Sequence, residues 1–84
     1  MEYTAHYDGF EARFVVRGAL LHTAGPQLSH QLRKAVALAN AHTLTLDLSR
    51  CSMMDSLALY ALADFCRWLD SRGDPVLFEV IVNA

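Results

Sequence analysis

The stretch from Leu44 to Leu59 constrains the fold of this sequence more than any other part. Leucines alternate with polar residues from position 44 to position 48, which is typical of a β-strand with one buried face. A short loop is expected next, and an amphipathic helix is expected to begin at Asp55-Ser56. A helix start has unpaired backbone N–H groups and a dipole that favours negative charge. Ser56 therefore either caps the helix or carries a phosphate, and Asp55 is a second candidate for the cap.

Turn residues and periodicity predict the elements on either side of this stretch. Two alternating runs around Asp8-Gly9 indicate a β-hairpin, and Gly18 is expected to end its second strand. Pro26 suits the first turn of a helix, and Asn40 is a plausible end for that helix. Gly73 is well placed to end the second helix in a left-handed conformation. The expected strands and helices are, in chain order, residues 3–7, 12–16, 26–40, 44–48, 56–72 and 76–82.

Helical spacing predicts which side of each helix is buried. The first helix is expected to bury Leu28, Leu32, Ala35, Val36 and Ala39. The second helix is expected to bury Leu59, Leu62, Phe65, Cys66 and Leu69. A further apolar stripe on the second helix is either a wider core contact or part of a docking face around Ser56. This stripe consists of Leu57, Tyr60, Ala61 and Trp68.

These elements give the order β-β-α-β-α-β and an α/β fold class. Right-handed crossovers would place both helices on one side of a mixed sheet. The final strand is nearly all apolar, which suits a strand buried on both faces of a parallel sheet. No repeat, low-complexity run or linker interrupts the sequence, so residues 1–84 are expected to form a single domain.

The composition predicts that the partner of this chain is another protein. Apolar residues make up 54% of the sequence and charged residues only 19%, which predicts that some surface is covered by a partner or by a second copy of the chain. The net charge of −2 and the scattered basic residues argue against nucleic-acid binding. The sequence has no apolar run long enough for direct membrane insertion and no secretory signal. Cytoplasmic localisation is therefore expected, with Cys51 and Cys66 as free thiols.

No motif in the sequence predicts catalysis or cofactor binding. The four histidines lack the spacing of a metal site, and neither cysteine lies near one of them in sequence. There is no glycine-rich phosphate loop. A chain of 84 residues also leaves little room for a substrate pocket beside its core. We therefore expect a protein without a metal or cofactor that is not an enzyme.

The residues from Leu44 to Gly73 resemble the STAS domain, the fold of bacterial anti-sigma factor antagonists and of sulfate transporter tails. The family signature is a hydrophobic strand ending in Asp-Leu-Ser, a short loop, and Asp-Ser-Ser/Thr-Gly-Leu at the start of a helix. The matching segments here are 46–49, Leu-Asp-Leu-Ser, and 53–59, Met-Met-Asp-Ser-Leu-Ala-Leu. A looser match, Gly-Ala-Leu-Leu-His-Thr-Ala at 18–24, corresponds to the family's Gly-Glu-Leu-Asp element.

The sequence departs from the family pattern at three places. Leu57 and Ala58 replace the second hydroxyl residue and the glycine of the signature. Ala19 and Leu21 replace the two acidic residues of the earlier element, which bears on any partner contact that relied on those charges. Family members usually continue past the fourth strand into another helix, whereas this sequence ends at Ala84. It is therefore either a truncated form or a minimal version, and an exposed sheet face would then favour pairing with another chain, including a homodimer.

The resemblance implies a role for each residue near the helix start. Ser56 corresponds to the family's phosphoacceptor, and the Asp55 carboxylate would repel a phosphate beside it and so help to set the phosphorylation equilibrium. One of the two methionines before Asp55 is expected to face outward. The expected partner-binding residues are Leu21, His22, Thr23, Met53, Met54, Asp55, Ser56, Leu57 and Tyr60.

Two functions follow from the resemblance, and they differ in the role of Ser56. The first is a cytoplasmic interaction switch in transcription regulation, which binds an anti-sigma factor with serine kinase activity and is released when Ser56 is phosphorylated. The second is a constitutive accessory subunit of a lipid-transporter complex or a stress-sensing scaffold, in which Ser56 only caps the helix. A truncated domain without activity is a third possibility, raised by the end of the sequence at Ala84.

Overall fold

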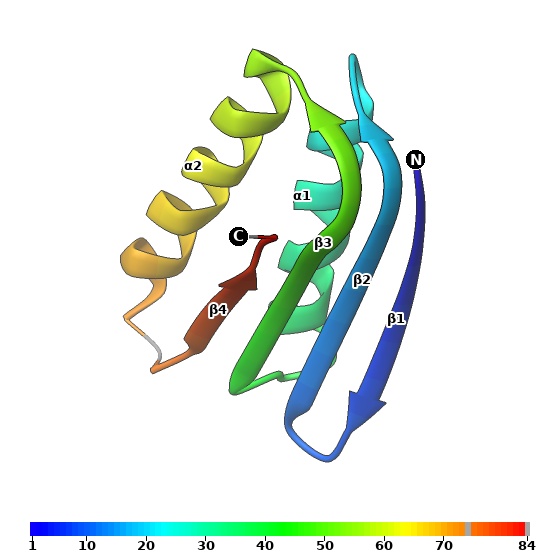
Figure 1. The fold of residues 1–84 in the computed structure, drawn as a ribbon. Helices are drawn as coiled ribbons and strands as arrows, with labels where there is room; N and C mark the ends of the chain where they lie inside the picture. Colours follow the sequence, from blue (N-terminus) through cyan, green and yellow to red (C-terminus); the bar gives the residue numbers. More distant parts are fainter. Residues whose placement is uncertain (74, 84) are drawn as a thin grey trace.

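The computed structural model describes residues 1–73 and 75–83, which form one sheet covered by two helices (Figure 1). The strands are β1 (Glu2–Asp8), β2 (Glu11–Leu20), β3 (Thr43–Met54) and β4 (Leu77–Ile81), and the helices are α1 (Ala24–Ala37) and α2 (Ser56–Arg72). The sheet order is β1-β2-β3-β4; β1 runs antiparallel to β2, and the other pairs are parallel. The expected β-β-α-β-α-β order is confirmed, and the described residues contain no further helix after β4.

The hairpin lies where the turn signal predicts it. Asp8 pairs with Glu11, so that only Gly9 and Phe10 form the connection. Gly9 has a φ of 59°, a left-handed conformation that glycine adopts at no steric cost. Phe10 stacks on the ring of His42 at 4.6 Å between centroids, which fixes the hairpin against the residue before β3.

Strands β2 and β3 both extend further than the sequence predicts. Gly18 does not end β2: it has a φ of 83° and lies at a shift in the register, after which β2 continues to Leu20. The expected loop after residue 48 is instead part of β3, which pairs with β2 as far as Met54. These irregularities break the alternation of buried and exposed residues. The sequence after residue 48 therefore lacks the pattern of a strand and is expected to be a loop.

The core lies between one face of the sheet and the two helices. Alternate residues of β2 and β3 point into it, as expected for strands with one covered face. Phe14 and Phe65 are the largest of the fully buried side chains, and they come from the sheet and from α2 respectively. The buried cluster also contains Ala12, Val16, Leu20, Leu28, Leu32, Ala35, Val36, Ala41, Leu44, Leu46, Leu48 and Ala58. The prediction for α1 is thus confirmed except at Ala39, which is exposed beyond the end of the helix.

Helix α2 has the predicted bounds, and its predicted buried stripe is confirmed at Phe65, which is fully buried, and at Leu62 and Leu69, which pack against the core. Its buried residues are Ala58, Ala61 and Phe65, whereas Leu59 is 55% exposed and Cys66 is also exposed. Ala58 adds a further buried position where α2 closely approaches Gly25 of α1, which the spacing of large side chains does not reveal. In the described residues, no helix is both long and apolar enough to cross a membrane.

Strand β4 is not buried on both faces, contrary to the prediction. It pairs only with β3 and therefore forms an edge of the sheet. Both helices lie on one side of the sheet, so the other face of β4 is uncovered (Figure 1). Leu77 is 58% exposed and Val80 is 46% exposed, while Phe78 packs against the core. The prediction failed because an apolar run indicates that a strand favours burial, but it does not indicate whether other elements cover both of its faces.

Candidate functional site at the start of helix α2

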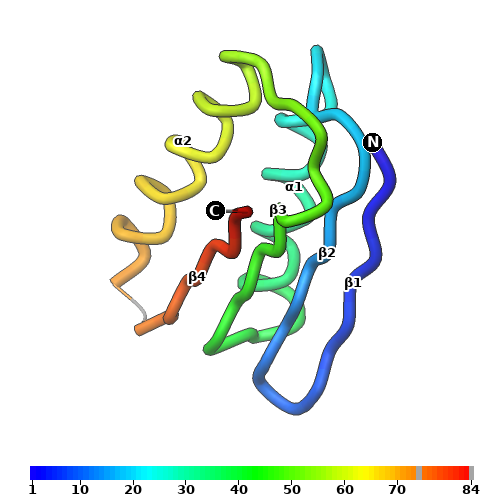
Figure 2. Tube along the Cα trace, viewed as in Figure 1, coloured from blue at the N-terminus to red at the C-terminus, as the bar shows by residue number. Residues whose placement is uncertain are grey.

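Two connections meet at the end of the sheet opposite the hairpin (Figure 2). One joins β2 to α1, and the other joins β3 to α2. The last residue of β2, Leu20, pairs with Met54 at the end of β3, and its carbonyl oxygen accepts a hydrogen bond from the Asp55 N–H at 3.2 Å. The extended pairing therefore brings the segment containing His22 next to the start of α2.

The Asp55 carboxylate links the two connections. One oxygen accepts a hydrogen bond from the His22 N–H at 2.7 Å, and the other accepts one from the Ala58 N–H at 3.0 Å. The backbone of Asp55 is extended, with φ −93° and ψ 179°, as expected for the residue that caps a helix. The His22 N–H, followed by the Ala58 N–H, lowers the pKa of Asp55 below its ordinary value of 3.8. The carboxylate is thus charged at neutral pH and held in place.

Ser56 is not the cap of α2, contrary to one of the two expectations. Asp55 occupies the cap position, so Ser56 is the first residue of the helix and is exposed. Its hydroxyl makes no hydrogen bond to any residue in the described part of the chain. The backbone N–H groups of Ser56 and Leu57 also lack partners among those residues. The site therefore presents a free hydroxyl beside free N–H donors at the positive end of a helix dipole.

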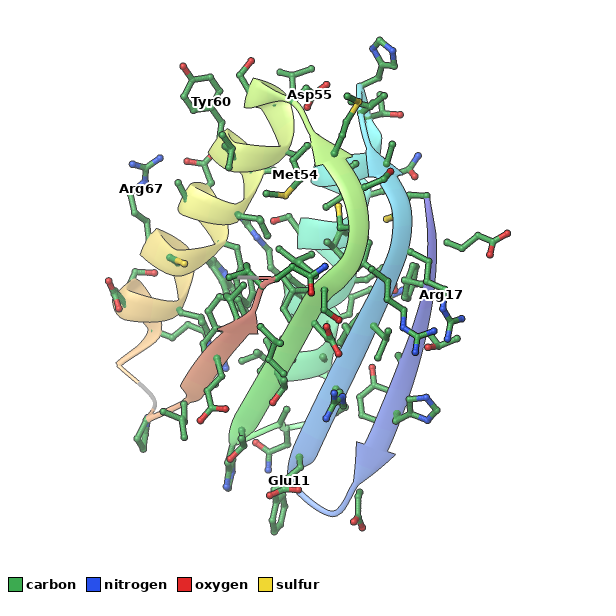
Figure 3. The ribbon with its side chains drawn as sticks, viewed as in Figure 1. Glu11, Arg17, Met54, Asp55, Tyr60 and Arg67 are labelled. Carbon is green, nitrogen blue, oxygen red and sulfur yellow. The ribbon has the colours of Figure 1, made fainter. Side chains whose placement is uncertain are left out.

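Exposed apolar side chains surround Ser56. Met53 is 58% exposed, Leu57 is 52% exposed and Tyr60 is 67% exposed. Met54 packs against the core, so one of the two methionines faces outward, as predicted. Figure 3 shows Met54 directed toward the interior and Tyr60 directed away from the helix. Of the predicted second stripe, only Ala61 and Trp68 contact the core, so the other two residues are available to a partner.

A groove runs from this apolar surface along the two helices. Its volume is about 420 Å³, and α1 and α2 each provide one wall. It is lined by Pro26, Ser29, His30, Arg33, Leu57, Tyr60, Ala61 and Asp64. The groove contains both charged and apolar side chains, and Leu57 and Tyr60 belong both to it and to the exposed apolar surface around Ser56.

The segment Leu21–Thr23 contributes backbone more than side chains to the site. Leu21 is half-buried, and His22 is exposed with a φ of 56°. The left-handed conformation of His22 directs its N–H toward Asp55, as the 2.7 Å hydrogen bond shows. Thr23 is the cap residue of α1, although its side chain makes no capping hydrogen bond. The sequence gives no signal for the left-handed His22, because the residue is not a glycine or an asparagine.

A close contact between the helices holds the site in place. Gly25 of α1 lies against Ala58 of α2, and a Cβ atom at position 25 would lie only 2.5 Å from the Ala58 Cα. Ala58 occupies the position of the glycine in the family signature and is fully buried. Its methyl group is accommodated because position 25 has no side chain. The described residues contain no cluster of three potential metal ligands, and both cysteines are free.

Comparison with known proteins identifies the fold. Residues 4–81 match the STAS domain family. No curated protein matches the chain. An anti-sigma factor antagonist from Mycobacterium paratuberculosis is similar in structure, with a TM-score of 0.81 and 22% identity over 99% of this chain and 68% of that one. The phosphorylated form of the Bacillus cell fate determinant SpoIIAA gives a TM-score of 0.72 and 18% identity over 99% of this chain and 73% of that one.

Another similar structure belongs to a much longer protein, Mglu. It gives a TM-score of 0.76 and 19% identity over 92% of this chain. The chain described here spans only 18% of the Mglu chain. At identities of this size, the three structural similarities show a shared fold.

Proposed function

The chain belongs to the STAS domain family, and on this premise we propose that it is an interaction switch resembling an anti-sigma factor antagonist. In this proposal it binds an anti-sigma factor with serine kinase activity in a bacterial cytoplasm. The partner phosphorylates Ser56 and then dissociates. The nucleotide is bound by the partner, so this chain needs no cofactor.

The position of the Ser56 hydroxyl is the observation that supports this proposal most directly. A serine that caps a helix uses its hydroxyl oxygen to accept a backbone hydrogen bond. Here Asp55 forms the cap, and the exposed Ser56 hydroxyl has no hydrogen-bond partner in the described part of the chain. A kinase can therefore reach Ser56, and phosphorylation leaves the structure at the helix start intact.

The charges around Ser56 would both stabilise and oppose a phosphate group on its side chain. A phosphoserine carries about −1.5 to −2 charges at neutral pH, and the first turn of a helix stabilises such an anion. The N–H groups of Ser56 and Leu57 are available as donors. The Asp55 carboxylate is negative and adjacent, so it opposes the phosphate. These two effects act in opposite directions, which suits a modification that is reversed.

The apolar surface around Ser56 explains how one phosphate would release a partner. Met53, Leu57 and Tyr60 would be covered by the partner, which excludes water from the contact. A phosphate at the centre of that surface would have to lose its hydration, at a large cost in binding free energy. No change of fold is needed. The similar SpoIIAA structure, solved in a phosphorylated form, supports the same kind of cycle.

The contact between Gly25 and Ala58 favours a second candidate function. The close packing fixes the first turn of α2 where family members have a flexible glycine. A kinase that requires local flexibility would not act on this serine. The chain would then be a constitutive accessory subunit of a transporter or scaffold, with its apolar surface permanently covered.

Mass spectrometry of the protein from its native cells separates the two candidates. The switch requires a fraction with a mass increase of about 80 Da, one phosphate, at Ser56. An unmodified mass across growth and stress conditions would instead favour the constitutive subunit. Once the partner is known, Ser56→Asp should weaken binding about tenfold, or 1.4 kcal/mol, while Ser56→Ala should preserve it. Ser52→Asp is the matched control, because Ser52 is also exposed and lies four residues before Ser56.

A further inference from the structure

The face of the sheet that the helices leave open carries opposite charges at its two ends. At the hairpin end, Asp8 pairs across the strands with Glu11. Nearer to the Ser56 site, Arg17 of β2 pairs with Arg50 of β3. Figure 3 shows Glu11 at the hairpin end and Arg17 further along the sheet. The sequence separates these two arginines by 33 positions, so their proximity is a result of the fold.

An irregularity in β3 brings Arg50 next to Arg17. Val15 pairs with Asp47, and the next pair is Arg17 with Arg50, so β3 contains one more residue than β2 between the two pairs. Without this extra residue, position 49 would lie opposite Arg17. Bulges of this kind redirect side chains and often occur at functional sites.

Two hydrogen bonds hold the bulge in its observed form. The Ser49 N–H donates to one oxygen of the Asp47 carboxylate at 2.9 Å. The Arg13 guanidinium donates to the other oxygen at 3.0 Å. Asp47 is therefore fully engaged with Ser49 and Arg13, and it is only 8% exposed. It positions the bulge but does not neutralise the arginine pair.

The charges near the arginine pair compensate it only in part within the described residues. Arg17 and Arg50 are both exposed, and neither forms an ion pair with a carboxylate in that part of the chain. The nearest acidic residue in the register is Glu2, which lies opposite Arg17 on β1. Like charges directly opposite each other destabilise a sheet. Glu2 lies opposite Arg17 only, so it compensates the two adjacent guanidinium charges in part, and a role in binding would explain why both are present.

We propose that Arg17 and Arg50 bind an acidic segment of a protein partner. Guanidinium groups form paired hydrogen bonds with carboxylates, and two adjacent groups can bind successive acidic side chains of an extended chain. The two arginines lie outside the cavity of about 470 Å³ near the hairpin end of this face. That cavity is lined by His6, Asp8, Glu11, Ala12, Arg13, Thr43, Thr45 and Glu79. The acidic hairpin end would repel the segment and so orient it toward the arginines. This contact does not depend on phosphorylation of Ser56.

Titration of the full chain with a synthetic poly-glutamate peptide, followed by NMR at low ionic strength, tests the proposal. The peptide should shift the amide signals of residues 15–17 and 47–51, and the affinity should fall as salt is added. Combining Arg17→Gln with Arg50→Gln should weaken binding about fivefold or more. Arg67→Gln on α2 is the control, because it removes the same charge from an exposed site far from the sheet face and should leave binding unchanged.

Three results would overturn the proposal. The first is that the peptide shifts no amide signals in residues 15–17 of β2 or 47–51 of β3. The second is an equal loss of binding in Arg67→Gln, which would indicate non-specific attraction. The third is binding of inorganic phosphate as tight as that of the peptide, since the site would then recognise a small anion. Thermal unfolding provides a further readout: Arg50→Gln should keep or raise Tm, and a fall in Tm would show that the pair is structural.

Discussion

The contact between the starts of the two helices predicts whether Gly25→Ala raises or lowers the stability of the protein. Gly25 is the second residue of α1, and its replacement by alanine would normally favour a helix by up to about 1 kcal/mol. In this structure, however, the new Cβ atom would lie 2.5 Å from the Ala58 Cα, 3.0 Å from its Cβ and 3.1 Å from its nitrogen. We therefore expect Gly25→Ala to destabilise the protein.

The magnitude follows from the geometry of the contact. Carbon atoms pack at about 3.5–4.0 Å, so the helices would have to separate by about 1 Å or more at this end. Overpacking in a core costs about 1–3 kcal/mol, and the upper end applies here because the obstacle is backbone rather than a flexible side chain. After subtraction of the helix preference, the net loss is about 2 kcal/mol. For a chain of this length, that loss lowers Tm by about 8–16 °C.

Thermal and urea unfolding of the purified variant would measure this change. Gln27→Ala is the control for helix preference, because Gln27 lies on the exposed side of the same helix. Adding Ala58→Gly to Gly25→Ala should not restore stability, since the closest atom is the Cα of residue 58. An unchanged or higher Tm in Gly25→Ala would refute the close helix contact and, with it, the fixed position of the Ser56 site.

Three further predictions concern the cap, the acidic residues and the core. Ser56→Ala should leave Tm nearly unchanged, whereas Asp55→Ala should lower it, because the capping oxygen atoms belong to Asp55; equal effects in calorimetry would contradict this assignment. The pKa of Asp55 is lowered by backbone N–H donors, and that of Asp47 mainly by the Ser49 hydroxyl and N–H, so their stabilisation is present above pH 3.8 and is lost as the pH falls through the lower folded values. A Tm that stays constant from pH 6 to pH 2 would argue against both arrangements. Phe65→Ala should cost about 3–5 kcal/mol and Leu59→Ala much less, in urea unfolding, because only Phe65 is fully buried.

The sequence was most informative where local chemistry determines the structure. The bounds of α2 follow from the Asp55 cap and from Gly73, which has the expected left-handed φ of 75°. The hairpin follows from Gly9, and the order of the elements follows from periodicity. The role of Asp55 as cap was one of two alternatives in the sequence, and the backbone position of Ser56 decided between them.

Features that depend on distant neighbours could not be predicted from the sequence. The close contact of α2 with α1 depends on Gly25 fitting against Ala58, and neither residue stands out in a hydrophobic pattern. The exposure of β4 depends on the absence of a strand beyond it among the described residues. The basic residues look scattered along the chain, yet the bulge in β3 places Arg17 and Arg50 side by side. Each of these features depends on which distant parts of the chain become neighbours, and none of them leaves a periodic signal in the sequence.

The two hydrogen bonds to Asp55 restrict what this position can be. Asparagine caps helices about as well as aspartate in general. At this position, however, each oxygen of the side chain accepts from a different backbone N–H, one in the β2–α1 connection and one in α2. An asparagine has only one such oxygen, and its NH₂ group would face a second donor. An amide side chain could accept the hydrogen bond from either connection, but accepting one on each of its two terminal atoms requires a carboxylate. The negative charge beside Ser56 is therefore a consequence of joining two loops through one side chain.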